Sequence, residues 1–190
     1  DETATVAPPE LVAWRPAHEQ LVLDAGTDQL RAAVIRPGVV YGGSRGIIAD
    51  LLASAENGLI RIVGTGENHW PLVYDRDLAD LYVRVLGSDE GRGIFHATDE
   101  ADEQVRAIAD AIAAHRPHPP DIRFMPIAEA RAKSGPYADA LALDQRVRSP
   151  RAHALGWAPS LRSVSSNIAR LFEELRRGRL AQQEQERHDA

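Results

Sequence analysis

The sequence contains no cysteine, which excludes disulfides, thiolate metal sites and cysteine nucleophiles. Its only lysine is Lys133, so a catalytic lysine could stand at one position at most. No apolar run approaches the roughly 20 residues that span a bilayer, and the acidic, proline-containing start does not resemble a signal peptide. We therefore expect a globular, cytoplasmic chain without a membrane partner.

The charge pattern also argues against two kinds of ligand. The net charge is −6, and the arginines are scattered among acids instead of forming the concentrated cationic face that nucleic-acid binding needs. None of the seven histidines stands at a spacing typical of metal ligands. We therefore expect no nucleic-acid partner and no metal site.

Helical and strand patterns alternate along the chain, which indicates an α/β protein. The strand patterns cover residues 30–40, 60–63, 93–97 and 122–127, and the helical patterns cover residues 16–25, 46–57, 77–86, 102–115, 127–147 and 161–177. Asp77 is expected to be a helix N-cap. Residues 1–178 are expected to form a single incomplete domain, and the polar residues 179–190 a disordered tail.

The most informative stretch is Val34-Ile35-Arg36-Pro37-Gly38-Val39-Val40-Tyr41-Gly42. A buried parallel strand that ends in Pro-Gly leaves backbone groups at the carboxyl edge of a sheet, where ligands of open α/β folds bind. An ordinary strand followed by a turn, without a ligand site, would show the same sequence pattern. As a string, the stretch resembles the Arg-Pro-x-x-Val-Tyr-Gly signature of the extended short-chain dehydrogenases/reductases, the NAD-dependent epimerase/dehydratase family.

Three further segments resemble that family in the same order. They are "EQLVLDAG" from Glu19, "IVGTGENHWPLVYDRDLA" from Ile62 and "SPRAHALGWAP" from Ser149. The resemblance covers most of residues 1–177. It implies a partial Rossmann-like parallel sheet with a small C-terminal α/β substrate lobe, and NAD or NADP as the cofactor.

Two features of the family are missing. Family members carry a Tyr-x-x-x-Lys pair, in which the lysine lowers the tyrosine pKa so that the phenol can exchange a proton. Counting back from Glu19, the tyrosine position falls on Leu11, which cannot exchange a proton, and the lysine position on Arg15. The Gly-rich fingerprint is also missing, because Gly64-x-Gly66 is followed by Trp70-Pro71 and not by a helix. The sequence reads as if it began after the fourth or fifth strand of a longer protein.

The resemblance implies the residues of a site, although no catalytic residue can be named from it. Arg15, Pro37, Gly38, Val39 and Val40 would face the cofactor, and Ser44, Arg45, Trp70 and Tyr74 would face the substrate. Trp70 stands where nucleotide-sugar enzymes commonly carry an arginine for the substrate phosphate, which favours an unphosphorylated ligand. The alternative is that Trp70 only packs under its loop and that Ser44 and Arg45 only form a turn.

Two classes of function remain open. The first is an NAD(P)-dependent epimerase, dehydratase or reductase, or part of one, acting on a small sugar-like or other unphosphorylated organic molecule. The second is a binding or structural module that kept the fold and lost the redox chemistry, and Leu11 favours it. The partners implied by the resemblance are the small-molecule substrate and either a second copy of the chain or a complementing N-terminal half.

Overall fold

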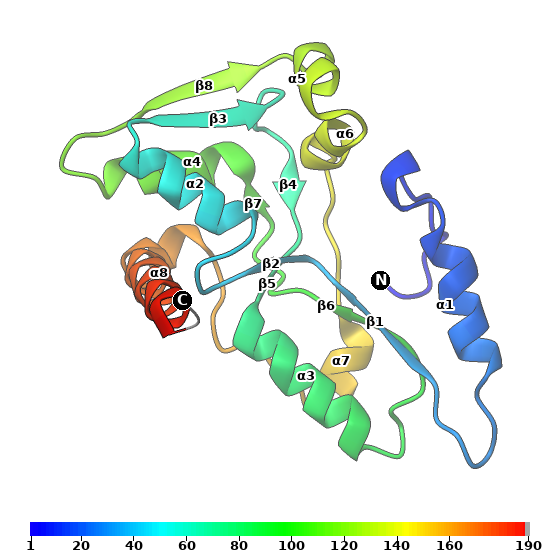
Figure 1. Ribbon diagram of the computed structural model, residues 1–190. Helices are drawn as coiled ribbons and strands as arrows, with labels where there is room; N and C mark the ends of the chain where they lie inside the picture. Colours follow the sequence, from blue (N-terminus) through cyan, green and yellow to red (C-terminus); the bar gives the residue numbers. More distant parts are fainter. Residues whose placement is uncertain (189–190) are drawn as a thin grey trace.

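The computed structural model describes residues 1–188 as an α/β arrangement of short strands and covering helices (Figure 1). The strands are β1 (Ala33–Pro37), β2 (Val39–Tyr41), β3 (Leu59–Val63), β4 (His69–Trp70), β5 (Leu72–Tyr74), β6 (Gly93–Ala97), β7 (Glu103–Gln104) and β8 (Asp121–Met125). The helices are α1 (Arg15–Asp24), α2 (Ile47–Glu56), α3 (Asp75–Gly87), α4 (Val105–Ala114), α5 (Ile127–Ser134), α6 (Tyr137–Ala142), α7 (Pro150–Ala154) and α8 (Ile168–His188), with 3₁₀ turns η1 (Glu10–Val12) and η2 (Ser165–Asn167).

The strands form pairs, and three of the four pairs are parallel. β1 pairs with β6, β2 with β5 and β3 with β8, while β4 and β7 are antiparallel. Parallel strands require crossover connections, and the helices between them supply these. The expected α/β class with a partial Rossmann-like parallel sheet is thus confirmed, as a set of short parallel pairs.

Two apolar clusters form the core on either side of β2 and β5 (Figure 1). The larger lies among α2, α4, α8 and strand β3, and it contains Leu52, Ile108 and Phe172. The smaller lies between α3, α7 and strand β6, and it contains Leu81 and Trp157. The buried side chains recur at helical spacing in α2 and α4, which is why the sequence pattern found these helices.

Two acidic side chains, the buried Asp77 and the half-buried Glu103, fix the loop that leads into α8. The carboxylate of Asp77 accepts hydrogen bonds from Ser160 Oγ (2.6 Å) and Leu161 N (3.0 Å). That of Glu103 accepts from Val164 N (2.5 Å) and Ser165 N (3.0 Å). The expectation that Asp77 is an N-cap is therefore wrong, because α3 begins two residues earlier and the carboxylate is used by a distant loop.

The expected disordered tail is also corrected by the structure. Helix α8 continues to His188 and so includes most of residues 179–190, and residues 189 and 190 lie outside the described part. Arginine, glutamine, glutamate and alanine are good helix formers, and Arg179 bonds to Glu56 of α2 at 2.6 Å, so the helix has an anchor beyond its buried stretch. None of the helices within residues 1–188 is both long and apolar enough to cross a membrane.

Candidate functional site

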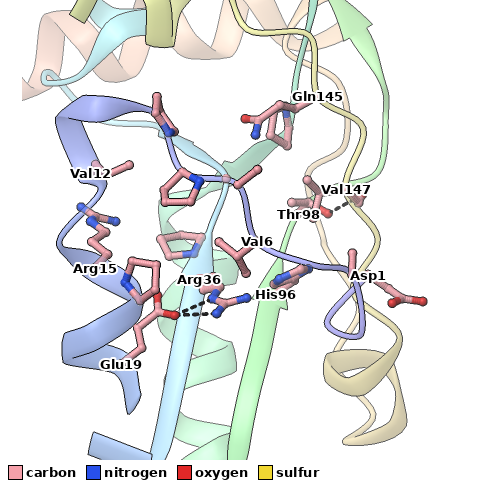
Figure 2. A pocket seen from close by; sticks show the side chains of 18 of the residues that line it. Asp1, Val6, Val12, Arg15, Glu19, Arg36, His96, Thr98, Gln145 and Val147 are labelled. Carbon is pink, nitrogen blue, oxygen red and sulfur yellow. Dashed lines mark hydrogen bonds and ion pairs between the residues drawn. The ribbon is translucent and has the colours of Figure 1, made fainter. Parts of the chain in front are cut away.

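A cavity of about 350 Å³ lies beside the carboxyl ends of β1 and β6, between α1 and the N-terminal segment (Figure 2). It is lined by residues 4–9, by Arg15, Pro16 and Glu19 of α1, by residues 36–38 at the end of β1, and by Asp1, Val12, Pro71, His96, Thr98, Gln145 and Val147. This position, outside the carboxyl ends of parallel strands, is where open α/β folds bind ligands. Its volume falls in the range of small-molecule sites, roughly 300–1,000 Å³.

The helical repeat of α1 places two charged side chains on the side of the helix that faces the cavity. Arg15 and Glu19 stand four residues apart, and both line the cavity. The carboxylate of Glu19 accepts two hydrogen bonds from the guanidinium of Arg36, at 2.9 and 2.5 Å. This ion pair neutralises Arg36 and fastens α1 to β1 (Figure 2). Arg15 forms no ion pair within residues 1–188, so its positive charge remains open to a ligand.

Of the residues expected to contact the cofactor, the structure brings Arg15, Pro37 and Gly38 together in this cavity. Val39 and Val40 continue into β2, where they pair with β5 and do not line the cavity. Gly38 lies so close to β5 that a Cβ atom there would be 2.4 Å from the carbonyl oxygen of Pro71. The glycine of the Arg-Pro-Gly string is therefore required by backbone packing.

The residues expected to contact the substrate lie elsewhere. Ser44 packs against Gly178 of α8, where an added Cβ would meet its Oγ at 2.6 Å. The hydroxyl of Tyr74 donates to Glu174 of α8 at 2.7 Å, and burial with this carboxylate raises the tyrosine pKa. Arg45 is exposed on the loop between β2 and α2 and does not line the cavity.

Trp70 is buried and lines a second cavity of about 200 Å³ under α2, together with Asp50, Arg61 and Tyr137. Its indole Nε1 donates to the carbonyl oxygen of Leu141 at 3.0 Å. The indole is therefore directed toward α6. Contact between Trp70 and a substrate stays a prediction.

Among residues 1–188, no tyrosine lines the cavity at the carboxyl ends of β1 and β6, which is called the main cavity below. Leu11, at the family's tyrosine position, lies exposed in turn η1, and its neighbour Val12 lines the cavity instead. Tyr41 is buried in the larger core, where its hydroxyl donates to the carbonyl oxygen of Leu161 at 3.0 Å. Burial and the nearby Asp99 raise the pKa of Tyr41 above its usual value, so this phenol is a poor proton donor.

Sequence reasoning missed the polar residues at the end of β6 and in the strap formed by residues 143–149. Thr98 Oγ1 lies 3.1 Å from Ser149 Oγ and donates to the carbonyl oxygen of Val147 at 3.1 Å, which binds the strap to β6. His96 and Gln145 line the cavity beside them. Only the pairing of β6 with β1, which places His96 opposite Arg36, indicates that His96 belongs to the site.

Within residues 1–188, no group of three or more histidine, aspartate or glutamate side chains is arranged to hold a metal ion. The cavity instead offers one open cation, one imidazole and several hydroxyl and amide groups. Such a set suits the hydroxyl and carbonyl groups of an organic ligand.

Residues 15–97 match the sequence model of the NAD dependent epimerase/dehydratase family. An uncharacterized protein of Schizosaccharomyces pombe is 28% identical over 161 residues, which cover 82% of this chain and 53% of that protein. The chain spans about half the length of the curated relatives it matches.

Solved structures share the fold. The UDP-glucose 4-epimerase of Thermus thermophilus, solved with NAD, superimposes with a TM-score of 0.75 at 19% identity, over 93% of this chain and 57% of that one. The human epimerase family protein SDR39U1, solved with NADPH, gives a TM-score of 0.67 at 23% identity, over 78% and 50%. Residues 15–97 of the chain are thus similar in sequence to the NAD dependent epimerase/dehydratase family, and the chain shares the fold of these solved structures.

Proposed function

We propose that this chain supplies the nicotinamide and substrate side of an NAD(P)-dependent epimerase, dehydratase or reductase. The observation that carries the proposal is the single cavity that collects Arg15, Pro37 and Gly38 at the carboxyl ends of β1 and β6. These residues come from two segments of the matched family region, and an α/β enzyme would be expected to use this edge.

The cavity residues fit one end of a dinucleotide. Arg15 carries an open positive charge beside the Pro37-Gly38 backbone, so it could hydrogen-bond a ribose or hold one phosphate oxygen. The pyrophosphate needs a glycine-rich turn before a helix N-terminus, and Gly64-x-Gly66 leads into strand β4. The cofactor, when bound, would supply hydride transfer, and this chain would bind and orient its nicotinamide end.

The substrate that fits best is a small, unphosphorylated organic or sugar-like molecule. Thr98, Gln145 and His96 present polar atoms suited to hydroxyl groups, while the pairing of Arg36 with Glu19 leaves Arg15 as the one open cation among the cavity residues within the described chain. A diphosphate substrate would call for more positive charge.

Apolar side chains exposed along α1 and α3 support a partner for this part of the chain. Leu21 is 68% exposed and Leu86 is 73% exposed, and a groove of about 490 Å³ runs over Leu30, Ile35 and Tyr82. Within residues 1–188, β1 pairs only with β6, so its other edge is open to a further strand. We propose that a complementing N-terminal half or a second copy covers these surfaces.

A second function is favoured by one observation, the exposed Leu11 at the position of the family's catalytic tyrosine. A binding module that kept the cavity without redox chemistry would have no need for a phenol there.

Calorimetric titration of the chain with NADH and NADPH tests the proposal. We expect saturable binding of one cofactor with a Kd on the order of micromolar. Arg15→Gln should weaken it about tenfold, because one charge-assisted hydrogen bond is lost. Arg162→Gln is the matched control, since Arg162 is exposed and remote from the cavity. A folded chain that binds neither cofactor would favour the second function.

A further inference from the structure

His96 stands at the end of β6, in register with Arg36 of β1. Its neighbours in sequence, Phe95 and Ala97, belong to the smaller core cluster, and alternate side chains of a strand point to opposite faces. The imidazole therefore projects toward α1 and lines the main cavity, where it lies beside Arg36 and beneath the N-terminal segment (Figure 2).

The hydrogen bonding of His96 fixes its tautomer. Nδ1 lies 3.2 Å from the carbonyl oxygen of Arg148, and because a carbonyl can only accept, Nδ1 must carry the hydrogen. In the neutral ring Nε2 is then an unprotonated acceptor. Within residues 1–188, Nε2 has no hydrogen-bond partner, whereas the rings of His69 and His153 use both nitrogens.

Burial keeps the His96 ring neutral near pH 7. Burial lowers its pKa, and Arg36 acts in the same direction. Glu2, whose carboxylate accepts the backbone N–H of His96 at 3.0 Å, and the carbonyl of Arg148 oppose them without reversing the shift. The ring can therefore accept a proton at neutral pH.

The other ionisable side chains of the cavity already have a partner or carry only hydrogen-bond donors. Oε2 of Glu19 accepts two hydrogen bonds from Arg36, and the guanidinium groups of Arg15 and Arg36 have no acceptor atom. The carboxylate of Asp1 accepts from the backbone N–H and the hydroxyl of Thr3, at 2.9 and 2.7 Å. Of the ionisable side chains that line the cavity, the imidazole of His96 is therefore the best placed to accept a proton.

We propose that Nε2 of His96 exchanges the substrate proton in this cavity, in place of the missing tyrosine; the proposal rests on the function proposed above. In the oxidation of a secondary alcohol, the hydroxyl proton would pass to Nε2 while the hydrogen on carbon leaves as hydride to a nicotinamide cofactor. The C–O single bond becomes a carbonyl, and the imidazole becomes an imidazolium. Reduction is the reverse, with the imidazolium as the acid.

Modification with diethyl pyrocarbonate, read residue by residue by mass spectrometry, tests whether Nε2 is a free base. Only an unprotonated, accessible ring nitrogen reacts. We expect His96 to react about tenfold faster than His69 or His153, because a hydrogen bond must break first in those rings. Its rate should titrate with an apparent pKa below 6.5. Reaction at His96 no faster than at His69 and His153 would overturn the proposal.

Turnover by the chain tests the proton transfer itself, with D-glucose as the probe and NAD⁺ or NADP⁺ as the oxidant. His96→Gln should lower kcat by about 10²–10⁴-fold and flatten the acidic limb of the pH profile, while NADPH affinity is unchanged. His118→Gln, in an exposed loop far from the cavity, is the control. Unchanged kcat in a folded His96→Gln variant would refute the role.

The two proposals can fail separately. If the wild-type chain binds neither NADH nor NADPH, the proposed function fails, and the modification rates alone decide whether His96 is the free base of the cavity. If cofactor binds and glucose is oxidised but His96→Gln keeps its kcat, the proposed function stands and the role of His96 falls.

Discussion

Asp99 should make the stability of this protein fall as the pH rises through the mildly acidic range. Its side chain is 2% exposed; Oδ1 accepts the Ala101 N–H at 3.1 Å and Oδ2 lies 3.3 Å from Tyr41 Oη. Burial, assisted by the charge of Glu103 and opposed by the Ala101 hydrogen bond, raises the Asp99 pKa from 3.8 to about 6. At about 1.36 kcal/mol per pH unit, this rise corresponds to about 3 kcal/mol.

The direction in which stability changes with pH follows from the linkage between proton binding and folding. Between about pH 4 and pH 6 the folded state binds more protons at Asp99 than the unfolded state does, so the free energy of unfolding decreases as the pH rises. Asp99→Asn stays neutral at every pH. We therefore expect the stability of the variant minus that of the wild type to increase by about 3 kcal/mol between pH 4 and pH 7.5.

Urea denaturation followed by circular dichroism at several pH values measures this difference. The difference in stability between variant and wild type isolates the effect of Asp99. The lowered pKa values of Asp102, Asp144 and Glu174 make stability rise with pH in both proteins, so their contributions cancel in the difference. Parallel stability curves for wild type and Asp99→Asn from pH 4 to pH 7.5 would refute the reasoning.

Two further predictions concern packing. Trp157→Ala should destabilise the protein by about 3–5 kcal/mol in the same denaturation assay, because the ring is 1% exposed and its Nε1 donates to the carbonyl oxygen of Asp77 at 2.8 Å; a loss under about 1 kcal/mol would contradict this packing. A double-mutant cycle of Arg36→Met and Glu19→Met should give a coupling energy of about 1–2 kcal/mol and faster hydrogen exchange in α1 for both single variants. A coupling energy near zero would mean that the ion pair does not hold α1 on β1.

Local pattern predicted the elements better than it predicted their pairing. The apolar run from Leu30 to Val40 was expected to be one strand, but the structure divides it at Gly38 into β1 and β2. β1 pairs with β6 and β2 with β5, and the close contact of Gly38 with Pro71 lies at the point of change. Such contacts join residues distant in sequence, and the period of apolar residues contains no information about them.

The site was predicted in part for the same reason. Arg15, Pro37 and Gly38 were expected together and share one cavity, because a resemblance preserves which segments meet. The directions of Trp70 and Tyr74 were not predictable, since each depends on a partner far along the chain, the Leu141 carbonyl and Glu174. His96 was considered in the sequence only as a metal ligand, because its relation to the cavity depends on strand register.

The residues that carry the family resemblance mostly hold the backbone in place. Arg36 ties β1 to the α1 residue Glu19, and Asp77 accepts Trp157 Nε1–H at its carbonyl and Leu161 N–H at its carboxylate. These contacts join the recognised segments to one another, so they can persist when the reaction changes. The strings therefore predict the fold more securely than the activity, and the chemistry has to be inferred from the groups that face the cavity.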